Sequence, residues 1–264
     1  HVVLQSIANG APILKAGSDA RNLGRIDIEY SDADKKVKSI DWELIPVTDQ
    51  IPEEASVVMV VEEYEGKLNA ELDQPVGETA VMLDALQANN QTRETNLGDL
   101  IADAYREETG AQIAIFNGGS IRSNQIYGPG KLTRRDVLSV LPFENPIVKM
   151  AIPGKTIRAA LEHGISEIEK KSDGRFPQVS GLTFEYDATK PAGSRVLSIL
   201  VGGKPLSDSK TYTMATNSYV ITGGDGYTMF ADAKYLIKPE SGNAESIALL
   251  NAFTKSKIIS PKVD

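Results

Sequence analysis

The stretch from Asn217 to Tyr227 gathers an aromatic ring, a carboxylate and three glycines. Tyr219 offers a flat face, and Asp225 lies between two glycines, which permit positive φ angles and close approach of a ligand to the backbone. A carboxylate accepts hydrogen bonds from two neighbouring hydroxyls. This combination suits a nucleoside, with the base on the ring and the ribose diol on Asp225. An ordinary Gly-Asp-Gly turn beside a core tyrosine fits the same residues equally well.

Two further loops carry arginines that suit phosphate. Arg93 precedes a predicted helix, whose N-terminal dipole and free N–H groups favour an anion. Arg122 ends the sequence Asn117-Gly-Gly-Ser-Ile-Arg122, and its guanidinium fork suits a bidentate phosphate contact. Asn117 both donates and accepts hydrogen bonds, as the edge of a base requires. The alternatives are a solvated surface arginine at position 93 and a simple strand-ending turn after Asn117.

A second ring and a further glycine extend this candidate site. Phe143 follows Pro142 after a predicted short helix, and is either a core residue or an exposed stacking ring. Gly181 is a candidate for backbone contact with a ligand. Four loops can therefore supply rings, donors and a carboxylate to one nucleotide.

Residues for covalent or metal chemistry are scarce. The chain has no cysteine and two histidines, His1 and His163. His163 falls beside Glu162 in a predicted helix, where a solvated residue is the more common interpretation than a ligand. Neither a Gly-x-Ser-x-Gly elbow nor a P-loop is present. The residues therefore predict a nucleotide-binding site without an attacking group.

Apolar periodicity places these loops between strands and helices. Helices are predicted over 53–72, 95–109, from Thr133 for a short stretch, and over 154–171 and 245–255. Strands are predicted over 12–17, 25–30, 37–45, 80–86, 113–116, 147–152, 182–186, 196–201 and 211–216. Thr133 with Asp136 predicts a capping box, and Gly110 a helix stop. We interpret residues 1–46 as the remnant of another domain, 47–72 as a linker helix and 73–264 as one α/β domain.

Composition narrows the classes of partner. Hydrophobic residues make up 41% and charged residues 24%, as in soluble globular proteins. The net charge of −8 argues against a nucleic-acid polymer as partner, whereas a small anion can still bind local arginines. No apolar run is long enough to span a bilayer. The chain opens on His1 rather than Met, which we interpret as the loss of an upstream segment.

Four motifs, in this order, resemble the C-terminal domain of the 5′-nucleotidase/UDP-sugar hydrolase family. They are Arg93-Glu-Thr-Asn-Leu-Gly-Asp-Leu-Ile-Ala-Asp103, Asn117-Gly-Gly-Ser-Ile-Arg122, Leu141-Pro-Phe143 and Asn217-Ser-Tyr-Val-Ile-Thr-Gly-Gly-Asp-Gly-Tyr227. The resemblance extends over residues 46–264 and implies an α/β fold of mixed sheets covered by helices. Residues 12–30 resemble the closing strands of the family's N-terminal calcineurin-like metallophosphoesterase domain.

The resemblance implies a role for each site residue. Phe143 and Tyr219 would enclose the base, and Asp225 would hold the ribose hydroxyls. Tyr219 stands where other members often have phenylalanine, which adds a hydroxyl to the stacking ring. The two arginines, Arg93 and Arg122, would bind phosphates. The residues Asn117 and Gly181 would lie beside the base or sugar.

The chemistry implied is two-metal hydrolysis, in which a metal-activated water attacks phosphorus. The family's metal ligands lie in its N-terminal domain, in Asp-x-His, Gly-Asp-x-x-Asp, Gly-Asn-His-Glu and Gly-His-x-His motifs. The first three motifs are absent here, and His1 is a candidate for the last letter of the fourth. Two divalent metal ions (Zn, Mn or similar) are therefore expected in that missing domain rather than fully bound in this chain.

By this resemblance, the full-length protein hydrolyses nucleoside 5′-phosphates in the bacterial periplasm or cell envelope, or as a secreted enzyme. This chain would be its substrate-binding half, which binds nucleotide without turnover and swings about residues 46–72 against the N-terminal catalytic domain. Alternatives on the same scaffold are a 2′,3′-cyclic-nucleotide phosphodiesterase/3′-nucleotidase and a UDP-sugar hydrolase. A non-catalytic nucleotide-binding or surface-recognition module is the alternative from another class.

Overall fold

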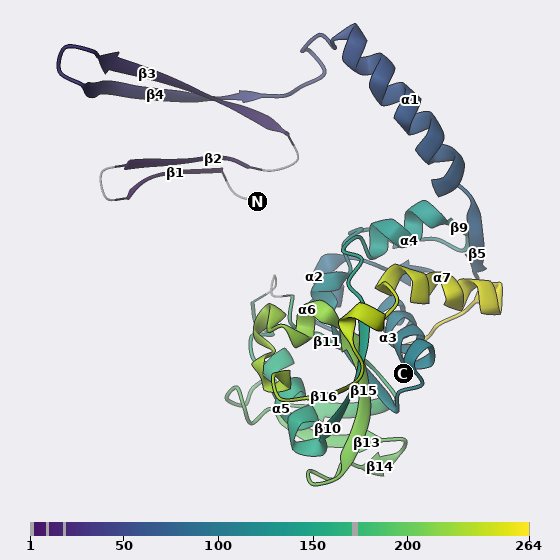
Figure 1. The fold of residues 1–264 in the computed structure, drawn as a ribbon. Coiled ribbons are helices and arrows are strands. Elements are labelled where there is room, and N and C mark those ends of the chain that lie inside the picture. Colours follow the sequence, from purple (N-terminus) through teal and green to yellow (C-terminus); the bar gives the residue numbers. More distant parts are fainter. Residues whose placement is uncertain (1–2, 9–10, 18–19, 171–173, 264) are drawn as a thin grey trace. The chain divides into compact units, whose positions relative to one another are not determined.

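The structure, a computed structural model, describes residues 3–8, 11–17, 20–170 and 174–263 (Figure 1). The contacts within the chain divide it into two compact units, His1–Lys67 and Leu68–Asp264. All of the residues that carry the predicted nucleotide-binding site belong to the second unit.

The first unit consists of two antiparallel hairpins and most of a helix. The hairpins pair β1 (Val3–Ala8) with β2 (Ala11–Ala16), and β3 (Asn22–Ser31) with β4 (Lys36–Pro46). The sequence predicted the last three of these strands but not β1. Leu23 and Ile28 are each 60% exposed, since a two-stranded ribbon covers neither of its faces. The predicted helix is confirmed as α1 (Ala55–Leu72), and none of its residues is buried.

A mixed five-stranded sheet forms the centre of the second unit (Figure 1). Its strand order is β11-β7-β15-β10-β16, in which β7 and β15 are parallel and the other neighbours are antiparallel. The strands are β7 (Ile113–Asn117), β10 (Ile147–Pro153), β11 (Pro177–Ser180), β15 (Thr211–Asn217) and β16 (Lys234–Ile237). The mixed α/β fold class predicted from the sequence is confirmed.

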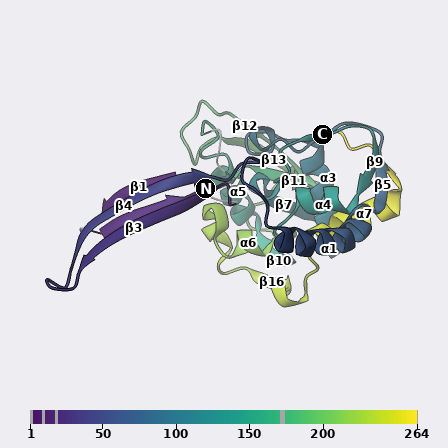
Figure 2. The ribbon, with the colours of Figure 1, turned by 90° about the horizontal axis from the view of Figure 1, so that it is seen from above.

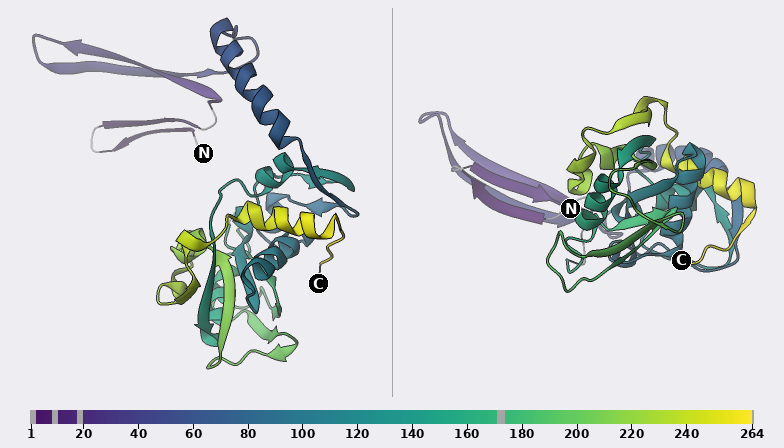
Figure 3. Two further views of the ribbon diagram at one scale, coloured as in Figure 1. Left: turned by 45° about the vertical axis from the view of Figure 1, so that its right-hand side comes forward. Right: turned by 90° about the horizontal axis from the view of Figure 1, so that it is seen from below.

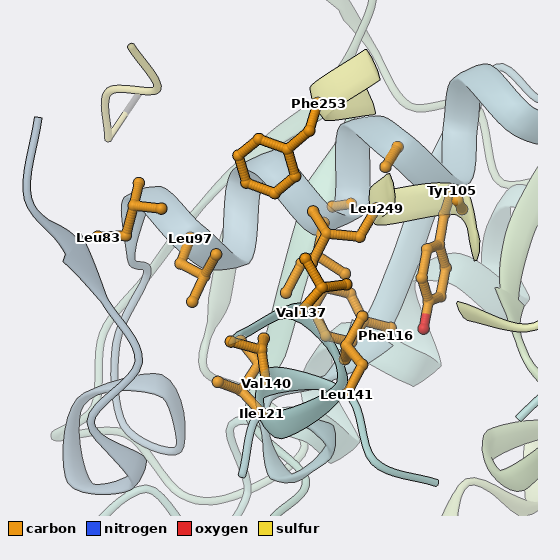
Figure 4. Packing of buried hydrophobic residues seen from close by; sticks show 14 of the residues in the cluster. Leu83, Leu97, Tyr105, Phe116, Ile121, Val137, Val140, Leu141, Leu249 and Phe253 are labelled. Atoms are coloured by element: carbon orange, nitrogen blue, oxygen red, sulfur yellow. The ribbon is translucent and has the colours of Figure 1, made fainter. Parts of the chain in front are cut away.

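Helices cover both faces of this sheet, because its central strands are apolar on both sides. In β7, Ala114 and Phe116 belong to one buried cluster, whereas Ile113 and Ile115 belong to the other. The first cluster packs under α3 (Asn96–Thr109) and α7 (Glu245–Ser256), and the second under α5 (Gly154–Gly164). Figure 3 shows α7 beside α3, and Figure 4 shows Phe116 packed among residues from these helices. Two cores therefore fix the sheet from which the site loops emerge.

Smaller elements surround the central sheet. One three-stranded sheet consists of β12 (Leu182–Tyr186), β13 (Val196–Val201) and β14 (Lys204–Pro205). A second consists of β17 (Ile258–Ile259), β5 (Pro75–Thr79) and β9 (Gly130–Thr133). A short pair is formed by β6 (Leu83–Asp84) and β8 (Ile126–Tyr127). The short helices are α2 (Gln87–Asn90), α4 (Arg134–Val140) and α6 (Ser218–Ile221), with 3-10 turns at 118–120, 224–226, 228–230 and 239–241. Figure 2 shows that β12 and β16 lie on opposite sides of this unit.

Helix ends follow the predicted capping chemistry. The Thr133 hydroxyl accepts from the Asp136 N–H, and the Asp136 carboxylate accepts from the Thr133 N–H at 2.8 Å, which completes the capping box. Thr95 caps α3, and Gly110 ends it in the left-handed conformation at φ 60°. The predicted capping box of α4 and the predicted stop of α3 are therefore both present in the structure.

Two predicted elements differ from the structure. The predicted strand over 80–86 is reduced to the two residues of β6, because side chains satisfy the backbone there instead of a partner strand. Thr79 Oγ1 donates to Val81 O at 2.7 Å, and Asp84 Oδ1 accepts from Leu86 N at 3.0 Å. The helix predicted over 154–171 ends at Gly164, where buried Arg195 donates to the Ile165 carbonyl at 2.6 Å.

Candidate functional site

One cavity of the second unit collects five of the seven predicted binding residues. We call this cavity, of about 380 Å³, the ring pocket. Its lining residues are Gln91, Asn117, Gly119, Ser120, Arg122, Phe143, Asn145, Gly174, Tyr219 and Asp225. The loops after β7, α4 and β15 supply most of these residues, and the parallel neighbours β7 and β15 end at the same edge of the sheet. The volume suits a small organic ligand.

Two aromatic rings stand exposed in the ring pocket. Phe143 is 52% exposed and Tyr219 is 42% exposed, although large aromatic side chains favour burial. The Arg122 guanidinium carbon lies 5.4 Å from the centre of the Phe143 ring, within cation–π range. Tyr219 belongs to α6, whose N-terminus Asn217 caps by accepting from Val220 N at 3.0 Å. The ring pocket therefore presents exposed aromatic faces beside a guanidinium group.

The Asp225 carboxylate is oriented by two neighbours in the ring pocket. Asn117 Nδ2 donates to its Oδ2 at 2.7 Å, and the Tyr219 hydroxyl donates to its Oδ1 at 2.8 Å. Asn117 is only 2% exposed, and its own Oδ1 accepts from Ser120 Oγ at 2.8 Å. These contacts fix the direction of the Asn117 amide, so this residue orients the aspartate in addition to lining the cavity.

The backbone of Asp225 is held in a conformation that residues other than glycine rarely adopt. Its φ and ψ of 50° and 19° lie in the left-handed region. His163 Nε2 donates to the Asp225 carbonyl at 2.8 Å, and the His163 ring packs edge-on against Tyr227 at 4.9 Å. The interpretation of His163 as a solvated helix residue was therefore wrong, since this half-buried ring supports the aspartate loop.

A buried carboxyl lies behind the ring pocket. Glu245 is fully buried at the start of α7, where its Oε2 accepts from the Tyr105 hydroxyl at 2.5 Å. Its Oε1 accepts from Asn145 at 3.2 Å, and Asn217 Nδ2 lies 3.4 Å from its Oε2. Burial raises the pKa of Glu245 to about 7, although the hydrogen bonds that it accepts lower it. Burial also raises the pKa of Tyr105, as does the nearby Glu245 carboxyl.

The amide of Asn217 joins this carboxyl to the ring pocket. Asn217 Nδ2 lies 3.3 Å from Asn117 Oδ1 and 3.2 Å from Ser120 Oγ. A chain of polar contacts therefore runs from Glu245 through Asn217 and Asn117 to Asp225. Sequence reasoning quoted Asn217 only as the start of a motif. It missed Glu245, whose single sequence signal is an acid in the first turn of an apolar helix.

The other two predicted residues, Arg93 and Gly181, line a different and larger cavity of about 730 Å³. We call it the β12 cavity. Its walls are Arg93 and Glu94, residues of α3 (Asp99, Asp103, Arg106), residues 176, 177, 179–184, 200, 202 and 203, Tyr186 and Val263. The structure therefore divides the predicted site residues between two cavities.

Internal contacts account for both of these residues. Arg93 Nη2 lies 3.6 Å from Asp84 Oδ2, in an ion pair between an exposed arginine and a half-buried aspartate. Gly181 has φ 73°, and a Cβ atom there would lie 2.3 Å from the Gln112 carbonyl oxygen, so the backbone itself requires glycine. Neither residue lines the ring pocket.

No group of three or more His, Cys, Asp or Glu side chains that could hold a metal ion occurs among the residues that the structure describes. His1, the candidate metal ligand, lies outside the described residues. In the described ranges, no helix is both long and apolar enough to cross a membrane.

Comparison with known proteins gives a consistent set of relatives. Residues 75–232 match the family model of the 5′-nucleotidase C-terminal domain. The chain is 35% identical over 225 residues to the trifunctional nucleotide phosphoesterase protein YfkN of Bacillus subtilis, and 27% identical over 282 residues to the 5′-nucleotidase of Bos taurus. The crystal structure of a 5′-nucleotidase precursor from Thermus thermophilus matches with a TM-score of 0.73 and 31% identity.

These matches cover the chain more fully than they cover the relatives. They include 81% of this chain but 15% of the Bacillus protein, and 100% of this chain but 48% of the bovine protein. The Thermus structure matches 98% of this chain and 53% of its own. The chain thus spans about half the length of the bovine and Thermus proteins, and much less of the Bacillus protein.

Proposed function

Since this chain belongs to the family of 5′-nucleotidase C-terminal domains, we propose that it is the nucleotide-binding part of a 5′-nucleotidase. The observation that carries the proposal is the ring pocket, where two exposed rings flank an oriented carboxylate. Exposed aromatic faces gain stacking energy when a planar ligand covers them. A nucleoside supplies that plane, and its ribose supplies hydroxyl donors for Asp225.

Five residues of the ring pocket have roles in this proposal. Phe143 and Tyr219 stack on the base, at about 1–3 kcal/mol for each stacked base. Asp225 accepts from the ribose hydroxyls, and Asn117 keeps it in place. Arg122 binds phosphate through its guanidinium fork, which matches phosphate oxygens in a bidentate contact. Arg93 contacts the phosphate only when its side chain leaves Asp84. Gly181 is required by the backbone conformation and has no ligand contact in this proposal.

We assign no hydrolytic step to this chain. The resemblance implies two divalent metal ions in the N-terminal part of the full-length protein, where they would activate water against the bound phosphate ester. The described residues bind and orient the nucleotide for that reaction, and the region 46–72 connects the two parts. The full-length protein is expected in the periplasm, in the cell envelope or outside the cell, and this chain alone is expected to bind without turnover.

A neighbouring activity on the same scaffold is the second candidate. The Bacillus relative is named a trifunctional nucleotide phosphoesterase, which favours activity on more than one kind of nucleotide phosphoester. The full-length protein would then release phosphate from 3′-AMP or open 2′,3′-cyclic AMP as fast as it hydrolyses 5′-AMP. A UDP-sugar would give UMP and a sugar phosphate without free phosphate, which chromatography of the products identifies. A non-catalytic binding module would act on none of these.

Phosphate release by the full-length protein tests the proposal. With divalent metal and 5′-AMP, we expect turnover that falls at least about 30-fold in kcat/KM for Asp225→Ala, because two hydrogen bonds to a charged acceptor are lost. The chain of 264 residues alone should release no phosphate but should bind adenosine in calorimetry. Turnover by this chain alone, or a full-length protein that neither binds nor hydrolyses nucleotides, contradicts the proposal.

A further inference from the structure

The Tyr219 hydroxyl has a task that stacking does not need. It donates to Asp225 Oδ1 at 2.8 Å and accepts from the Asp225 N–H at 3.2 Å. The same hydroxyl therefore binds the side chain and the main chain of one residue. A phenylalanine ring at position 219 would supply the stacking face without either bond.

The two oxygens of Asp225 are used in equal measure by the protein. Asn117 donates to Oδ2 at 2.7 Å, and Tyr219 donates to Oδ1. A carboxylate oxygen accepts about two hydrogen bonds, so each oxygen keeps one acceptor position for a ligand. Two vicinal hydroxyls fill both positions, whereas a single hydroxyl leaves one of them without a donor once water is displaced.

The ring that carries this hydroxyl is itself fixed against the loop. A Cβ atom on Gly224 would lie 2.5 Å from the Tyr219 ring, so the ring rests directly on the Gly224 backbone. Gly223, just before it, has φ 90°, and Asp225 has φ 50°. The His163 bond to the Asp225 carbonyl holds the other side of the peptide. Ring, hydroxyl and carboxylate therefore form one rigid group.

We propose that the Tyr219 hydroxyl is a specificity-determining group that holds the Asp225 carboxylate for a vicinal diol, so that the ring pocket selects ribonucleosides and their nucleotides over 2′-deoxy and 3′-deoxy compounds. This inference rests on the proposed nucleotide binding and refines it. Tyr219 contributes stacking to every nucleoside through its ring, but its hydroxyl acts through Asp225 and matters only when both ribose hydroxyls are present.

Calorimetric titration of the 264-residue chain with adenosine, 2′-deoxyadenosine and 3′-deoxyadenosine separates the two contributions. The variants are Tyr219→Phe and Tyr219→Trp, which keep a ring and remove the phenol. The control is Tyr235→Phe, which removes a phenol from β16, outside the ring pocket. We expect both Tyr219 variants to bind adenosine about fivefold more weakly, and both deoxynucleosides within about twofold of the unchanged chain. Tyr235→Phe should change no affinity.

The ratio of adenosine to deoxyadenosine affinity decides the result. An unchanged ratio in both Tyr219 variants, an equal loss for all three nucleosides, or tighter binding of adenosine overturns the inference. Tighter binding would mean that the hydroxyl competes with ribose instead of holding Asp225. If the unchanged chain does not bind adenosine at all, the proposed function fails, and this inference fails with it. Binding without a change of ratio removes only the inference.

Discussion

The two cavities of the second unit differ in size and in the aromatic surface that they expose. The β12 cavity is larger, at about 730 Å³ against about 380 Å³ for the ring pocket. Its charges already serve one another, since Arg106 Nε donates to Ser180 Oγ at 2.8 Å and Ser180 Oγ donates to Asp103 at 2.5 Å. In the ring pocket, the Asp225 carboxylate is likewise paired with Asn117 and Tyr219, but this cavity also holds two exposed rings, and the Asp225 backbone is left-handed. The proposed function therefore follows exposed stacking faces and strained backbone rather than cavity size.

The largest difference in adenosine affinity should come from replacing one aspartate by alanine in each cavity. Asp225→Ala removes the acceptor of two ribose hydroxyls, and we expect adenosine binding to weaken about 100-fold. Asp103→Ala removes a carboxylate from the β12 cavity and should leave adenosine binding within about twofold, since its ion pair with Arg106 is exposed. Calorimetry measures both. Equal losses in the two variants would contradict the distinction between the cavities.

The buried carboxyl behind the ring pocket predicts a pH-dependent stability. Because the folded pKa of Glu245, about 7, lies above its ordinary value of 4.5, the folded state holds this proton more tightly than the unfolded state. That contribution is complete below pH 4.5 and is lost as pH rises to about 7, a change of up to about 3 kcal/mol in the free energy of unfolding. Glu245→Gln should remove it.

Urea unfolding at pH 5 and pH 7, followed by near-ultraviolet circular dichroism of the tyrosines, checks this prediction. The quantity to compare is the pH dependence of the unchanged chain minus that of Glu245→Gln. Asp103→Asn, in the β12 cavity, is the matched control and should keep the full dependence. An identical pH dependence in Glu245→Gln and the unchanged chain would show that Glu245 does not hold a proton in this range.

A paired removal of rings sharpens the comparison further. Phe143→Ala takes away one exposed stacking face and the ring beneath Arg122, and we expect about 30-fold weaker binding of adenosine and 2′-deoxyadenosine alike. Phe184→Ala takes a ring from the β12 cavity, where it stacks on Tyr186 at 5.7 Å, and should leave both affinities unchanged. Circular dichroism confirms that each variant is folded. A larger loss of affinity from Phe184→Ala than from Phe143→Ala would mean that the base binds in the β12 cavity, which would contradict the proposal.

The smallest effect concerns the two arginines. Arg122→Ala should weaken the binding of AMP about tenfold relative to the binding of adenosine, because Arg122 already lines the ring pocket. Arg93→Ala should weaken AMP only about threefold, since leaving the Asp84 pair offsets part of its phosphate contact. The AMP-to-adenosine affinity ratio isolates the phosphate term from the base. If Arg122→Ala leaves this ratio unchanged, Arg122 does not bind the phosphate.

Sequence reasoning worked best where local chemistry decides the outcome. The capping box of Thr133 and the Gly110 helix stop depend on neighbours within a few residues, and both are confirmed. The strand over 80–86 was wrong because Thr79 and Asp84 side chains satisfy the backbone, which apolar periodicity does not reveal. Edge strands such as β16 lack a long apolar run, so their pairing depends on the strand beside them.

The candidate site was predictable in its parts but not in its arrangement. Residue types and glycine spacing indicated the loops of Phe143, Tyr219 and Asp225, which line one cavity in the structure. Their separation in the chain gave no distance, so Arg93 and Gly181 were grouped with them and lie in the other cavity. The raised pKa of Glu245 results from its burial in the packed structure, which the sequence pattern does not reveal. Ligand binding by these residues stays a prediction.

A crystal structure of this chain with adenosine tests the central claim most directly. We predict the adenine ring between the side chains of Phe143 and Tyr219, with the ribose 2′ and 3′ hydroxyls at about 3 Å from the two Asp225 oxygens, the usual hydrogen-bond length. Adenosine bound in the β12 cavity, or a ring pocket in which the base contacts neither ring, would contradict the account.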